Sequence, residues 1–78
     1  MAKVVLSNHV QYRLYEREID AHEAIRIAKD GKVTKRSLDG SIIREGMCSN
    51  GKKLFVVSIL QGSNIVIETA YYDKNTIR

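Results

Sequence analysis

The sequence contains a single cysteine and no long run of apolar residues. Cys48 alone excludes an internal disulfide framework and a zinc site built from several cysteines. The first apolar run, Val4–Leu6, has three residues and is too short for a signal peptide. No stretch approaches the roughly 20 apolar residues of a membrane span. We therefore expect no membrane partner and a reducing, cytoplasmic setting.

Motifs for cofactors and metals are also missing. The sequence has no Walker loop, no dinucleotide fingerprint, no internal repeat and no linker, so we expect no nucleotide cofactor. His9 and His22 lack a close ligand spacing, and Cys48 does not complete a zinc site. Cys48 also lacks an activating neighbour in sequence, which argues against a nucleophile. We expect neither a metal nor another cofactor.

The chain has the size and composition of one small globular domain, residues 1–78. It is 44% hydrophobic and 28% charged, so disorder is not indicated. Thirteen Lys and Arg against nine Asp and Glu give a formal net charge of +4. This balance favours polyanions, of which nucleic acid is the commonest.

The first half of the chain predicts two helices. Ser7 is a good N-cap, and it precedes a helix at about residues 8–18. Asp20 is an N-cap followed three residues later by a glutamate, which matches a capping box and begins a second helix at residues 21–30. Gly31 ends that helix as a glycine C-cap.

The second half predicts strands at about residues 32–38, 41–48, 53–60 and 64–72. Three turns separate them, at Asp39-Gly40, Asn50-Gly51 and Gln61–Ser63. The strand at 53–60 is almost continuously apolar, which predicts a central position covered on both faces. The fold class is therefore α+β: two N-terminal helices packed on one face of a four-stranded antiparallel meander sheet. The other face is open, covers a dimer partner, or forms a binding surface.

His9, Arg13 and Arg17 recur every four residues along the first helix. This spacing places them on nearly the same side, drifting by about 40° per step. The imidazole is suited to acid–base work near neutral pH, and the two guanidinium groups to phosphate binding. Three such groups in one stripe predict a site that holds and acts on a phosphate.

A structural interpretation of the same stripe stays open. His9 would then cap the helix or bond to the backbone, and the stripe would be a solvated helix face. Arg17 lies nearest to the apolar side formed by Val10 and Leu14, so its stem would run along the sheet. Its charge would then pair with Glu68 or with Glu45.

The last strand and two basic groups supply further candidates. Tyr71 would orient or stack on the substrate, and Thr69 shares its sheet face because the two are two residues apart. The basic residues Lys35, Arg36 and Lys53 would extend a phosphate track. In the structural alternative the lysines and arginine are solvated strand ends, and the tyrosines of the chain (Tyr12, Tyr15, Tyr71 and Tyr72) are core, sheet-edge or half-buried aromatics.

The sequence resembles the domain-of-unknown-function 4258 family. The shared residues are the string from His9 through Arg13 to Glu16-Arg17, a second helix ending in glycine, the valine-rich strand at 54–59, and the closing Thr69-x-Tyr71. Glu18 departs from the pattern, because many members carry glycine there. The resemblance implies the architecture of small RelE-like and ParE-like toxins and RNA as the substrate.

These observations predict a RelE-like RNA-binding or RNA-cleaving module, and a toxin paired with an antitoxin protein is one form of it. Metal-independent cleavage would use His9 as acid or base, Arg13 and Arg17 on the phosphate, and Tyr71 to orient the substrate. The alternative is a non-catalytic interaction domain that forms a homodimer through its free sheet face or an edge strand.

Overall fold

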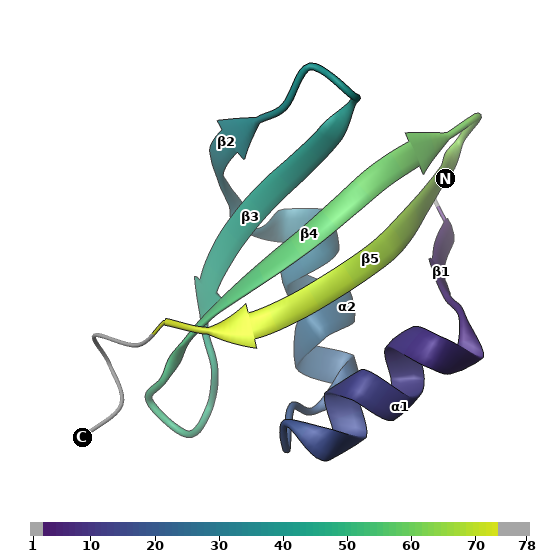
Figure 1. The fold of residues 1–78 in the computed structure, drawn as a ribbon. Helices are drawn as coiled ribbons and strands as arrows, with labels where there is room; N and C mark the ends of the chain where they lie inside the picture. The colour runs from purple at the N-terminus through teal and green to yellow at the C-terminus, as the bar shows by residue number, and fades with distance from the viewer. Residues whose placement is uncertain (1–2, 74–78) are drawn as a thin grey trace.

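The computed structural model describes residues 3–73, which form five strands and two helices (Figure 1). In chain order the elements are β1 (Lys3–Leu6), α1 (Asn8–Glu16), α2 (Ala21–Asp30), β2 (Lys32–Arg36), β3 (Ser41–Met47), β4 (Lys53–Gln61) and β5 (Asn64–Tyr72). None of the helices in this part of the chain is long and apolar enough to cross a membrane.

The sheet has the strand order β1-β5-β4-β3-β2. Strands β2 to β5 form the antiparallel meander, while β1 pairs in parallel with β5. The α+β class is confirmed, but the predicted arrangement is wrong: the sheet has five strands and is mixed, and a strand precedes both helices. Val4–Leu6 is too short to show strand periodicity, and its partner lies at the far end of the chain. Parallel pairing of this kind requires a long crossover, which α1 and α2 help to supply.

Both helices begin where the capping residues predict. The Ser7 hydroxyl accepts a hydrogen bond from the Val10 N–H at 3.2 Å, and the Asp20 carboxylate accepts one from the His22 N–H at 2.8 Å. The predicted capping box does not close, because the Glu23 carboxylate bonds elsewhere.

A Schellman motif ends α1 earlier than predicted, at Glu16. The Glu18 N–H donates to the Tyr15 carbonyl at 3.1 Å and the Ile19 N–H to the Leu14 carbonyl at 2.9 Å, with Leu14 and Ile19 both buried. Glu18 has φ +56°, the left-handed conformation that normally selects glycine. The turn therefore keeps its shape although glutamate occupies the position.

The core lies between the helices and one face of the sheet (Figure 1). Its fully buried members come from α1, α2, β4 and β5, and they include Leu14, Ile27, Leu54, Val56 and Ile67. At β3 the helix approaches closely, because a Cβ on Gly46 would lie 2.8 Å from Ile27 Cγ1. A side chain at this position would push α2 away from the sheet.

The other face of the sheet carries no helix from residues 3–73, and we call it the open face (Figure 1). The prediction that β4 is central is confirmed, since it is the middle strand. The prediction that both its faces are covered is wrong. Its residues alternate between buried and half-buried because the helices cover one face only. The half-buried residues of β4 are Lys53, Phe55, Val57 and Ile59.

Candidate functional site

The solvent side of α1 presents both aromatic and cationic groups. Tyr12 is 60% exposed and Tyr15 is 82% exposed, so the expectation of half-buried rings is wrong for both. Only Val10 and Leu14 face the core from this nine-residue helix. The helix packs beside β5 and β1, and the rest of its circumference stays in solvent.

His9 and Arg13 are also exposed on α1, although Arg13 lies nearly opposite Tyr15 around the helix because the two are two residues apart. His9 and Arg13 are one helical turn apart, and His9 also neighbours Tyr12 three residues on. We call His9, Tyr12, Arg13 and Tyr15 the α1 surface. Glu16 is the acidic residue of α1, and its charge offsets that of Arg13.

Arg17, the third member of the predicted stripe, donates hydrogen bonds to the sheet. Its Nη1 donates to the Ala70 carbonyl oxygen at 2.7 Å and to the Thr69 hydroxyl at 3.2 Å. The pairing of β1 with β5 stops at Ile67, so residues 68–72 have a described strand neighbour on one side only. Arg17 binds along this free edge. The structural interpretation of Arg17 therefore describes its position. The predicted partner was wrong, because Arg17 donates to a backbone carbonyl and not to the carboxylate of Glu45 or Glu68.

Tyr71 lies on the open face, across the sheet from the side that α1 covers. It is in register with Phe55, and the two ring centroids are 5.5 Å apart. Thr69 has the same parity as Tyr71, as predicted, but its hydroxyl accepts from Arg17 at the strand edge. The structure therefore does not bring Tyr71 to His9.

The basic candidates on the strands are distributed over the sheet. Lys35 is in register with Ile43, and both lie on the open face. Lys53 is on the same face, and its Nζ lies 3.1 Å from a carboxylate oxygen of Glu45. Arg36 pairs in register with the buried Ile42, so it belongs to the helix-bearing side. These residues do not form one track with the α1 surface.

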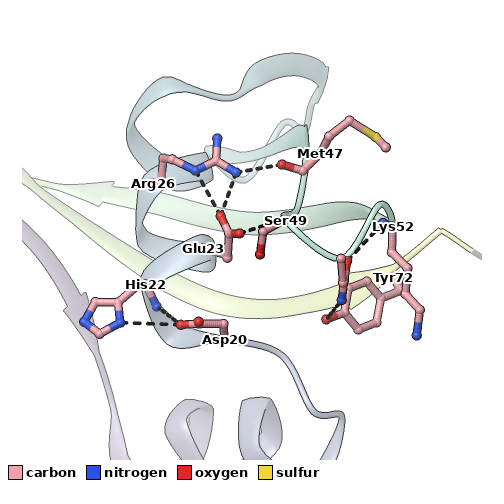
Figure 2. Close-up of polar contacts among 9 residues, drawn as sticks. Asp20, His22, Glu23, Arg26, Met47, Ser49, Lys52 and Tyr72 are labelled. Atoms are coloured by element: carbon pink, nitrogen blue, oxygen red, sulfur yellow. Dashed lines mark hydrogen bonds and ion pairs between the residues drawn. The ribbon is translucent and has the colours of Figure 1, made fainter.

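A polar network at the β3–β4 turn was missed by sequence reasoning (Figure 2). The Glu23 carboxylate accepts from the Ser49 N–H at 2.9 Å and from Arg26 at 2.7 Å, and Arg26 also donates to the Met47 carbonyl at 2.7 Å. The Ser49 N–H, helped by Arg26, lowers the pKa of Glu23. The spacing of Glu23 and Arg26, three residues apart, was the available signal. This network fastens α2 to the turn.

Tyr72, on β5, also forms hydrogen bonds near the β3–β4 turn. Its hydroxyl donates to the Glu18 carbonyl at 3.1 Å and accepts from Asn50 Nδ2 at 3.3 Å. The Nζ of Lys52 lies 5.1 Å from the centre of its ring (Figure 2). Tyr72 is thus a structural aromatic that joins the interhelix turn to the β3–β4 turn.

Residues 3–73 contain no group of three or more His, Cys, Asp or Glu side chains placed to hold a metal. His22 is exposed, with its Nδ1 3.5 Å from Asp20. Burial raises the pKa of the Cys48 thiol, with a smaller contribution from Glu23. A raised pKa disfavours the thiolate that a nucleophile requires.

Comparison with known proteins found no matching family model, no matching curated protein and no matching solved structure. The resemblance to the domain-of-unknown-function 4258 family therefore stays a prediction from the residues that carry it.

Proposed function

We propose that this protein is an RNA-binding module that contacts single-stranded RNA through the α1 surface. One observation carries the proposal: a single short helix carries two tyrosine rings that are 60% and 82% exposed, and Tyr12 neighbours His9 one turn away. Large aromatic rings are costly to leave in water, so a helix that presents two of them is suited to a partner with flat apolar faces.

Unpaired bases offer such faces. Stacking of a base on an aromatic side chain contributes about 1–3 kcal/mol, and it requires no particular base. Arg13 would pair with a phosphate in the bidentate geometry of guanidinium groups, and the His9 ring would offer a further hydrogen-bonding group. A duplex hides its base faces, which is why single-stranded RNA fits this surface best.

Two further facts support RNA as the partner. The chain has a net charge of +4, which attracts a polyanion over long distances. The family resemblance independently implies RNA. The proposal covers binding and leaves out the cleavage mechanism, since Tyr71 lies across the sheet from His9 and Arg17 is held by the Ala70 carbonyl.

Fluorescence anisotropy with a labelled oligouridine, at low salt, tests the proposal. The double variant Tyr12→Ala/Tyr15→Ala should weaken binding about tenfold or more, because two stacking contacts are lost. Arg13→Ala should weaken binding less and should reduce its salt dependence by about one phosphate contact. Lys29→Ala on α2 removes one positive charge away from the α1 surface and serves as the matched control.

Equal affinities for wild type, the tyrosine double variant and the Lys29 control would show that RNA does not bind at α1. A second readout separates binding from cleavage. Wild type and His9→Ala are incubated with labelled total RNA in chelator and analysed on a gel. Intact RNA in both lanes agrees with a module that only binds RNA. Cleavage by wild type alone would show that the protein also cleaves RNA, and would overturn this part of the proposal.

A further inference from the structure

The guanidinium group of Arg17 keeps one edge free. Its hydrogen bonds to the Thr69 hydroxyl and the Ala70 carbonyl are both donated by Nη1. Arg17 is an exposed residue, and its Nε and Nη2 donate to no other group within residues 3–73. A guanidinium edge with two parallel N–H groups is the part that binds a carboxylate or a phosphate in bidentate geometry. Arg17 is therefore fixed at one end and open along an edge suited to an oxyanion.

No carboxylate in the part of the chain that the structure describes occupies this edge. Glu16 precedes Arg17 on the chain, and Glu68 precedes its partner Thr69. Neither glutamate forms an ion pair with Arg17. The free edge is thus available to an anion that is not part of residues 3–73.

A second guanidinium group lies one helical turn earlier. Arg13 and Arg17 are four residues apart, which places them about 40° apart around the helix. The Arg13 side chain is exposed and donates to no group within residues 3–73. Like charges at this spacing repel each other. An anion that contacts both groups would offset this repulsion.

We propose that Arg13 and Arg17 together bind one phosphate of the RNA strand at the α1 surface. This inference rests on the proposed RNA binding and adds Arg17 to the residues that contact the strand. Arg17 binds the phosphate through Nε and Nη2, while Nη1 stays on β5. Because β5 already holds the guanidinium group, little side-chain freedom is lost when the phosphate binds.

Thr69 is a positioning residue in this arrangement and does not contact the phosphate. Its hydroxyl accepts from Nη1 of Arg17 at 3.2 Å, next to the Ala70 carbonyl at 2.7 Å. Two acceptors fix the plane of the guanidinium group, whereas one acceptor leaves the group free to rotate. The Thr69 hydroxyl therefore orients the edge that faces the phosphate.

Nitrogen-edited NMR spectra of the arginine side chains test the site in the full chain. Oligouridine should shift the Nε–H signals of both arginines and the ring signals of Tyr12 and Tyr15. A second oligouridine of the same length carries an uncharged methylphosphonate in place of every phosphate. It should still shift the tyrosine rings, because stacking requires no charge, but it should shift the Nε–H signal of Arg17 far less.

Arg17→Lys tests the bidentate contact. Lysine keeps the charge and can donate to the Ala70 carbonyl, but it has no second edge for the phosphate. The affinity for oligouridine, measured by fluorescence anisotropy, should fall about threefold to tenfold, while the circular dichroism spectrum stays that of wild type. Thr69→Val should weaken binding less and should broaden the Nε–H signal of Arg17. Arg36→Lys makes the same exchange on β2, at the opposite edge of the sheet, and should bind like wild type.

The results distinguish the phosphate site from RNA binding itself. The phosphate site is overturned if oligouridine shifts the tyrosine rings but not the Nε–H signal of Arg17. It is also overturned if Arg17→Lys binds with wild-type affinity. In both cases RNA binding through the tyrosines stands. If neither the tyrosine rings nor the arginine signals respond to oligouridine, both proposals are overturned.

Discussion

The Arg17 guanidinium donates a hydrogen bond to the Ala70 carbonyl oxygen over 2.7 Å. This contact joins the end of α1 to the part of β5 that lies beyond its pairing with β1. An exposed strand edge invites pairing with other chains, and a charged side chain laid along it is a common protection. Arg17 therefore contributes to stability and blocks an edge at the same time.

We expect Arg17→Ala to lower the free energy of unfolding by about 1–3 kcal/mol, because a partly buried carbonyl loses a charged donor. Chemical denaturation with urea measures the change. Arg13→Ala removes the same side chain one turn earlier on the exposed side and should stay within about 0.5 kcal/mol of wild type. Equal losses in the two variants would contradict the structural role of Arg17.

Glu18→Gly should stabilise the protein by about 1 kcal/mol. Glu18 has φ +56°, and an L side chain pays a steric cost there that glycine does not. Thermal unfolding detects the gain as a higher Tm. The matched control is Glu16→Gly, which places glycine at the last residue of α1 and should destabilise by up to about 1 kcal/mol. A loss of stability in both variants would mean that the turn does not select glycine.

The Glu23 network should make the fold sensitive to acid. The pKa of Glu23 is lowered in the folded state by the Ser49 N–H and by Arg26. A lowered folded pKa contributes stability that is present above the unfolded value of about 4.3 and is lost as the pH falls through the folded pKa. Denaturation at a series of pH values between neutral and strongly acidic should show this loss.

Glu23→Gln should be less stable than wild type at neutral pH, and the difference should shrink as the pH falls below about 4. Glu16→Gln removes a carboxylate from α1 outside this network and should keep the wild-type acid dependence. A constant difference between Glu23→Gln and wild type at every pH would contradict this assignment.

Gly46→Ala should destabilise the protein by about 1–3 kcal/mol, because the new Cβ would lie 2.8 Å from Ile27 Cγ1 in a packed core. A double-mutant cycle with Ile27→Ala locates the cause. The double variant should cost clearly less than the sum of the two single changes, since removing the Ile27 side chain makes room for the new methyl group. If the two destabilisations simply add, the strain in Gly46→Ala does not come from contact with Ile27.

Local chemistry made the helices and turns predictable. Ser7 and Asp20 cap the helices through their own side chains, and the glycines at 40, 51 and 62 adopt positive φ in the turns that separate the strands. Each of these features depends on neighbours a few residues away. The interhelix turn also depends on nearby residues. It forms a Schellman motif even with glutamate at position 18, because Leu14 and Ile19 are both buried beside each other.

The candidate site was predictable only in part, because the exposure of a side chain depends on elements far away in the sequence. Helix periodicity placed His9 beside Arg13 on exposed α1, but it did not show that Tyr12 and Tyr15 also stay in solvent. Periodicity states which residues share a side. It does not state how much of that side another element covers.

The sequence by itself determined the two helices, the antiparallel hairpins and the alternation along the strands, because short-range hydrogen bonds and steric preferences decide them. Only the tertiary structure decided that Val4–Leu6 pairs with β5, that Arg17 turns to the Ala70 carbonyl, and that Tyr71 lies across the sheet from His9. These relationships join segments far apart in the chain. They depend on which surfaces remain to be buried once the local elements have formed.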